Sequence, residues 1–168
     1  MNSEIADLEH DLDVALKVDF ASLPPAVQEE NLAALTRVRS KVDALDHRVL
    51  LPFEASQQHR AQGHGSVVGW LEHNCRVQGE DAAARRRLSR RLRNQPLAEE
   101  ALAGGEITDR HVEVLARARR WLGDERYQWG EQLLVDFAIT KRFTDFVLAV
   151  DYFVARAAPE VGEDDEDT

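Results

Sequence analysis

Residues 80–94 read EDAAARRRLSRRLRN, a run without glycine or proline that predicts one helix. At about 100° per residue, Ala84, Leu88 and Leu92 fall on one face of that helix. This apolar face can pack against the rest of the protein, while the opposite face presents arginine to solvent. The arginines on or beside the opposite face are the candidate site residues: Arg86, Arg87, Arg90 and Arg93.

A shorter predicted helix, residues 66–74, precedes the arginine helix, and residues 75–79 form the turn between them. This order is the outline of a helix-turn-helix, whose second helix enters the major groove of DNA. Arginine suits such a contact because its planar guanidinium binds phosphate or guanine edges through two hydrogen bonds. A solvated face, or pairing with Glu and Asp from the first sixty residues, is the alternative explanation. A second basic patch follows at Arg117, Arg119 and Arg120.

The rest of the chain also has the pattern of helices separated by proline and glycine. Pro52 is expected to kink or end a long helix near Leu51, because proline lacks an N–H and clashes with the preceding turn. Ser66 and Thr108 are expected helix N-caps, and the glycines at 104–105 end another helix. No alternating Val, Ile and Thr pattern predicts a strand. The predicted fold class is therefore all-α, a multihelical bundle.

We predict one helical domain over residues 1–158. It comprises a long-helix hairpin over residues 1–60 and a helical bundle over residues 61–158. The remaining residues, 159–168, contain the acidic run EDDED and almost no apolar side chains. Such a segment has too little apolar surface to offset the entropy lost on folding, so this tail is predicted to be disordered.

The chain has 168 residues, with 31 acidic against 21 basic side chains and a formal net charge of −10. A uniform spread of that charge would repel nucleic acid and anionic membranes. The charge is not uniform, because residues 76–93 have seven arginines against Glu80 and Asp81, a balance of +5.

No apolar run is long enough to span a membrane, and the acidic N-terminus does not resemble a secretory signal. The single cysteine excludes an intrachain disulfide. We therefore expect a cytoplasmic protein without membrane contact.

The long helix after residue 25 has an apolar seam with alternating steps of three and four residues. The seam is short, about two heptads. Packing inside a bundle and contact between two copies in a homodimer both remain open. The seam residues are Leu35, Val38, Val42, Leu45 and Val49.

Patterns for catalysis or metal binding are weak in this sequence. His59, His64, His73 and Cys75 are near one another in the chain, but their spacing matches no usual pair of zinc ligands. No glycine-rich phosphate-binding loop is present. His111, near the start of a helix, is expected to pack or to cap. We expect no catalytic residue, no metal and no cofactor, and we predict that the protein is not an enzyme.

Three short patterns between residues 66 and 111 point to a known family. They are Ser66-x-x-x-Trp70-Leu71, Arg87-Leu88-x-x-Arg91-Leu92, and Pro96 followed by Ala101-Leu102, Gly105, Ile107 and His111. In this order and spacing the chain resembles domain of unknown function 222, over residues 20 to 157.

This resemblance implies the helical N-terminal part of larger proteins of GC-rich bacteria, often associated with mobile elements. An HNH endonuclease domain usually follows in those proteins. We expect the nuclease half to be absent from this chain, which offers no histidine base and metal ligands in a ββα arrangement. The resemblance therefore implies a non-catalytic accessory module that contacts DNA. A protein-interaction or oligomerisation module is the alternative.

Overall fold

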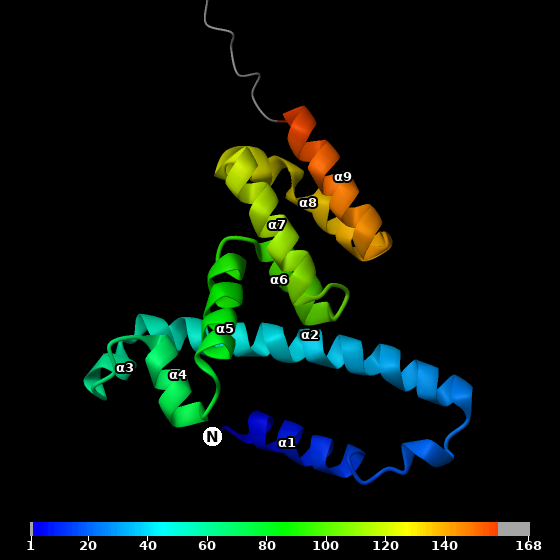
Figure 1. Cartoon of the computed structure of the whole chain (residues 1–168), viewed down its shortest axis with the longest axis vertical. Helices are drawn as coiled ribbons and strands as arrows, with labels where there is room; N and C mark the ends of the chain where they lie inside the picture. The colour runs from blue at the N-terminus through cyan, green and yellow to red at the C-terminus, as the bar shows by residue number, and fades with distance from the viewer. Residues whose placement is uncertain (1, 158–168) are drawn as a thin grey trace, which may run out of the picture. The chain divides into compact units, whose positions relative to one another are not determined.

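The computed structural model describes residues 2–157 (Figure 1). Over this range every regular element is an α-helix or a short 3-10 helix, so the predicted all-α class and the multihelical bundle are confirmed. The predicted disordered tail, 159–168, lies outside the described residues.

The chain divides into two compact units, Met1–Leu35 and Thr36–Thr168. The first unit contains α1 (Ser3–Ala15), the 3-10 helix η1 (Phe20–Ser22) and the start of α2 (Pro25–Ala55). The single domain expected over residues 1–158 stays a prediction. Several large apolar side chains of the first unit are exposed to solvent, namely Leu12, Val14, Leu16, Val18, Phe20, Val27, Leu32 and Leu35.

The second unit begins with the rest of α2, and shorter helices follow it. They are α3 (Gln58–Ala61), α4 (Val67–Cys75), α5 (Gly79–Leu92), α6 (Pro96–Gly104), α7 (Asp109–Leu122), α8 (Asp124–Thr140) and α9 (Phe143–Ala157).

Local signals set several of these helix ends as predicted. Ser66 starts α4, and its Oγ accepts a hydrogen bond from the Gly69 backbone N–H at 3.1 Å. Thr108 precedes α7, and its backbone N–H donates to Nδ1 of His111 at 3.2 Å, which confirms the expected capping role of that histidine. Gly105 ends α6 with a φ of 77°, a left-handed conformation that glycine adopts without steric cost.

Of the two outcomes expected at Pro52, a kink or an end of the long helix near Leu51, the end is wrong. Pro52 lies inside α2, and the helix continues to Ala55. Proline costs a helix one backbone hydrogen bond and crowds the preceding turn. Packing of the last turn offsets this cost, since Phe53 contacts Trp70 of α4 with ring centroids 4.5 Å apart.

Helix α7 lies at the centre of the main core and packs against α5, α8 and α9 (Figure 1). Its Val112 and Leu115 are fully buried, and Leu134 of α8 and Phe146 of α9 reach the same core. A smaller core joins α2, α4 and α5 through Leu50, Val67, Leu71 and Ala82. Helix α5 contributes to both cores through Ala82 and Leu92.

The apolar seam of the long helix is only partly buried. The residues that α2 buries lie on another face: Ser40, Ala44, His47 and Leu50. Along the seam, Leu35, Val42 and Val49 are 48%, 41% and 56% exposed, and Val38 and Leu45 are half-buried. Packing within the described residues therefore accounts for only part of this seam.

Candidate nucleic-acid interface

Two of the α5 arginines point toward α2 and form ion pairs there. Arg86 donates from Nε and Nη2 to Oε1 of Glu54, at 2.8 and 2.5 Å. Arg85 pairs with both carboxylate oxygens of Asp46. Arg86, one of the four candidate residues, is therefore neutralised by a carboxylate of the long helix, as the alternative explanation of the arginine face expects.

The buried face of α5 agrees with the predicted apolar face at two of three residues, since Leu92 is buried and Leu88 packs against the main core. Ala84 is instead exposed, and Ala82 and Ser89 are buried. The polar Ser89 is buried because its Oγ lies 3.0 Å from Nδ1 of the buried His47 on α2. Burial lowers the pKa of the His47 imidazole, because desolvation disfavours its charged form. The pattern of apolar residues located Leu88 and Leu92 but could not indicate the buried Ser89, whose partner is a histidine of another helix.

Arg87, Arg90 and Arg93 are exposed, and none of them forms an ion pair with another residue in the range 2–157. Their surroundings differ. Arg87 borders a hollow of about 400 Å³ between α5 and α7 in which four arginines face four carboxylates. The carboxylates are those of Asp43, Glu80, Asp109 and Glu113, and they balance the arginine charge on that side of α5.

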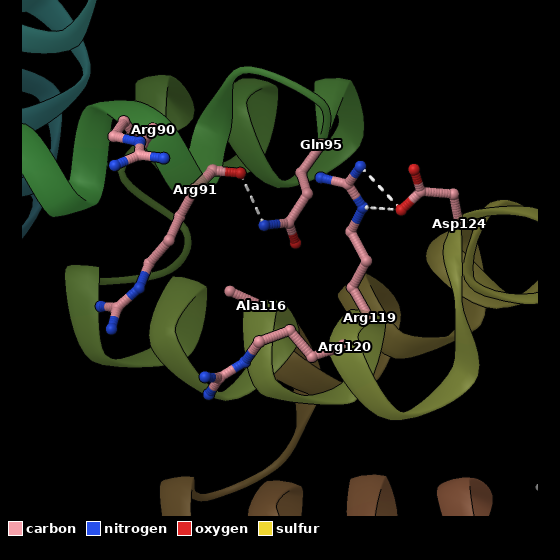
Figure 2. Close-up of a pocket in the computed structure, with 7 residues that line it drawn as sticks. All are labelled: Arg90, Arg91, Gln95, Ala116, Arg119, Arg120 and Asp124. Carbon is pink, nitrogen blue, oxygen red and sulfur yellow. Dashed lines mark hydrogen bonds and ion pairs between the residues drawn. The ribbon is translucent and has the colours of Figure 1, made fainter.

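On the other side of α5 is a second hollow, of about 390 Å³, which we call the basic hollow (Figure 2). Two arginines from α5 and two from α7 line it, with Asp124 as the one carboxylate among the lining residues. Arg91 also lines the hollow of balanced charge and pairs there with Glu113, so the formal balance of the other charged residues is +2. The four arginines are Arg90, Arg91, Arg119 and Arg120.

The arginines of the basic hollow are not equivalent. Arg119 donates from Nε to Oδ1 of Asp124 at 2.9 Å, and Arg91 makes a longer contact of 3.4 Å with Glu113. Arg90 and Arg120 form no ion pair within the part of the chain that the structure describes. These two exposed guanidiniums are therefore available to an anion from solution.

A buried hydrogen-bond network holds the floor of the basic hollow in place. The Gln95 side chain lies between the arginines, with Nε2 donating to the Arg91 carbonyl at 2.7 Å (Figure 2). Its Oε1 accepts a hydrogen bond from the Tyr127 hydroxyl at 2.7 Å. Because Gln95 and Tyr127 are fully buried, the network fixes the end of α5 relative to α8.

Another buried side chain supports the same region from α8. Burial raises the pKa of the Glu131 carboxyl, and the backbone N–H groups of Ala98 and Leu97, at the start of α6, oppose that rise. Its Oε1 is buried without a hydrogen-bond partner among residues 2–157. Glu131 is therefore a buried carboxyl whose ionised form is disfavoured in this core.

The four arginines meet here because two helices end at the hollow. Arg90 and Arg91 lie in the last turn of α5, and Arg119 and Arg120 in the last turn of α7. Cations stabilise a helix C-terminus, whose free carbonyls have partial negative charge. The sequence marked both basic segments, but only the packing of α5 on α7 brings them together.

The histidine and cysteine cluster in the sequence does not form a metal site in the structure. The His64 and His73 rings approach each other, with centroids 5.3 Å apart, and Cys75 is exposed. Within residues 2–157 no three His, Cys, Asp or Glu side chains come close enough to hold a metal ion.

Comparison with known proteins adds no further information about the site. No family model, no curated protein and no solved structure matches this chain. None of the helices between residues 2 and 157 has the length and apolar character needed to cross a membrane.

Proposed function

We propose that this protein is a non-catalytic module that contacts DNA, and that the basic hollow is its contact surface. The observation that carries the proposal is the pair of exposed guanidiniums, Arg90 and Arg120, beside Arg91 and Arg119. Guanidinium groups bind phosphate through short, charge-assisted hydrogen bonds. Release of counterions from the nucleic acid adds a favourable, salt-dependent contribution to the binding free energy.

The distribution of charge along the chain supports this function despite the net charge of −10. Residues 1–35 contain eight acidic side chains against Lys17, and residues 158–168 contain six acidic side chains. The remaining residues, 36–157, have a net charge of +3. The excess of acid therefore belongs to the two ends of the chain, and the helical body between them is mildly basic.

The contact we propose is mainly to phosphates. Helix α5 packs on both flanks, so Arg87, Arg90 and Arg93 are the arginines it leaves exposed. A helix that reads bases must insert one broad face into the major groove. Phosphate contacts position a protein on DNA without reading its sequence. The sequence resemblance implies an accessory module that accompanies an HNH endonuclease. Contact with phosphates suits such a module in the cytoplasm.

Fluorescence anisotropy with labelled DNA at low salt tests the proposal. We expect the double variant Arg90→Gln/Arg120→Gln to weaken binding by about tenfold or more, because two charge-assisted contacts are lost. The matched control is Arg48→Gln/Arg110→Gln, which removes the same charge from exposed arginines outside the basic hollow. Equal affinities of the wild type and the first variant, with circular dichroism showing both folded, would disprove the proposal.

A second candidate function is self-association through the long helix. The observation that favours it is the exposed part of the α2 seam, where Val42 and Val49 are 41% and 56% exposed. Sedimentation velocity across a concentration series tests it. A dimer that dissociates in the variant Val42→Ser/Val49→Ser supports self-association, and a monomer at every concentration excludes it.

A further inference from the structure

Trp121, in the last turn of α7, is 72% exposed, although tryptophan is large and apolar. It borders a groove of about 390 Å³ between α7 and α9. Ala118 of α7 and Val150 and Val154 of α9 form apolar walls of this groove. The groove is thus an apolar slot with an aromatic ring at its edge.

The groove and the basic hollow lie on two flanks of the same end of α7. Arg120 lines the basic hollow, and the next residue, Trp121, lines the groove. Consecutive helix residues are about 100° apart around the axis and about 1.5 Å apart along it. A ligand that contacts both side chains needs an anionic group beside a flat apolar group.

We propose that this groove takes the base of an unpaired nucleotide, which stacks on Trp121 while neighbouring phosphates bind Arg90 and Arg120. The inference rests on the proposed contact with DNA, and it adds a preference for single-stranded or frayed DNA over intact duplex. The bases of a duplex are stacked inside the helix and cannot reach a groove on the protein surface. Bases of a single strand can, and every base has a face that stacks on an aromatic ring.

The charge around the groove favours a nucleotide over an apolar protein segment. Arg117 and Asp151 pair across the groove between α7 and α9, with Nη2 and Oδ1 2.8 Å apart, and so cancel each other's charge. The net positive charge close to Trp121 therefore comes from the basic hollow. An apolar peptide would gain nothing from those arginines, whereas the phosphates of a nucleotide bind them.

The chain contains a natural control for this inference. Trp129 on α8 is 88% exposed, more than Trp121, but it lines neither the groove nor the basic hollow. If any exposed tryptophan could bind DNA regardless of its position, then loss of Trp121 and loss of Trp129 would weaken DNA binding equally. Stacking in the groove makes only Trp121 important.

The test measures anisotropy of a labelled oligothymidine and of a labelled duplex with the full chain at low salt. We expect Trp121→Ala to weaken oligothymidine binding by about fivefold or more, the range of single base–aromatic stacks, and to leave duplex binding unchanged. Trp121→Phe keeps an aromatic ring and should restore most of the affinity. Trp129→Ala should bind both DNAs as the wild type does.

Tryptophan emission gives a second measurement. Stacking on a base quenches the emission of the stacked indole, so oligothymidine should quench the wild type and Trp129→Phe but not Trp121→Phe. If Trp121→Ala and Trp129→Ala both bind oligothymidine like the wild type, stacking is refuted. In that case the proposed DNA contact is still supported if Arg90→Gln/Arg120→Gln loses DNA binding. The proposed DNA contact is itself refuted if the wild type binds neither oligothymidine nor duplex. Capture of an apolar peptide in the groove with no effect of oligothymidine would also refute stacking.

Discussion

The salt dependence of DNA binding provides a quantitative test of which arginines contact phosphate. Arg90 and Arg120 line the basic hollow without an ion pair in residues 2–157, and Arg93 is exposed nearby on the same helix end. Arg86 is excluded because it pairs with Glu54. The proposed DNA contact therefore involves about three phosphates, which corresponds to a slope of log K against log salt of about −2.7 for duplex DNA.

This slope predicts specific changes in affinity. A fourfold increase in salt concentration should weaken wild-type binding by about 40-fold. In Arg90→Gln/Arg120→Gln only one contact remains, so the slope should fall to about −0.9 and the same salt increase should cost about fourfold. Anisotropy titrations of one labelled duplex at several potassium chloride concentrations measure both slopes.

The control variant for the slope is Arg48→Gln/Arg110→Gln. Arg48 pairs with Glu99 and Arg110 with Glu113, both outside the basic hollow. We expect this variant to keep the wild-type slope, although its net charge equals that of the first variant. Identical slopes for the wild type and Arg90→Gln/Arg120→Gln, or an equal reduction in both variants, would show that the basic hollow is not the contact.

Three further predictions concern the framework that positions the hollow. Gly105→Ala should destabilise the protein by about 2–4 kcal/mol in urea denaturation, because φ is positive and the added Cβ would lie 3.1 Å or less from atoms of α2. The control is Gly63→Ala, where φ is also positive but no atom lies within 4 Å of the added Cβ, and it should cost only about 1 kcal/mol. The folded-state pKa of His47 is lowered, so the unfolded chain binds a proton at this histidine more tightly than the folded protein does. The free energy of unfolding should therefore fall as pH drops below about 6.5, and it should fall less steeply in His47→Gln. Parallel pH profiles of stability for the wild type and His47→Gln would contradict this. Burial raises the folded-state pKa of Glu131, so its ionisation opposes folding. As pH rises from about 4.5 to 7, the wild type should lose stability relative to Glu131→Gln, and parallel pH profiles would contradict this.

Prediction from sequence succeeded where the decisive interactions are local. The N-cap of α4 at Ser66, the capping box of Thr108 with His111 and the end of α6 at Gly105 each depend on residues within a few positions of one another. The helix end expected near Leu51 was wrong, because the local cost of Pro52 is offset by packing of Phe53 on a helix that follows later in the chain.

For the candidate site, the sequence identified the basic segments but not the state of each arginine. Arg86, Arg87, Arg90 and Arg93 are indistinguishable by composition, and all lie on one helix. In the structure Arg86 is paired, Arg87 borders a hollow of balanced charge, and Arg90 lines the basic hollow. The partners that make this difference come from α2 and α7, more than twenty residues away in the chain.

The sequence by itself determined that this protein is helical and where several of its helices begin or end, because those properties depend on backbone geometry and on hydrogen bonds between near neighbours. Only the tertiary structure decided which charges remain available. An ion pair depends on which carboxylate lies within about 4 Å, and distant segments meet through packing that no local pattern encodes. Asp46 and Glu54 of α2 therefore neutralise one side of α5, while the meeting of α5 with α7 leaves Arg90 and Arg120 exposed on the other.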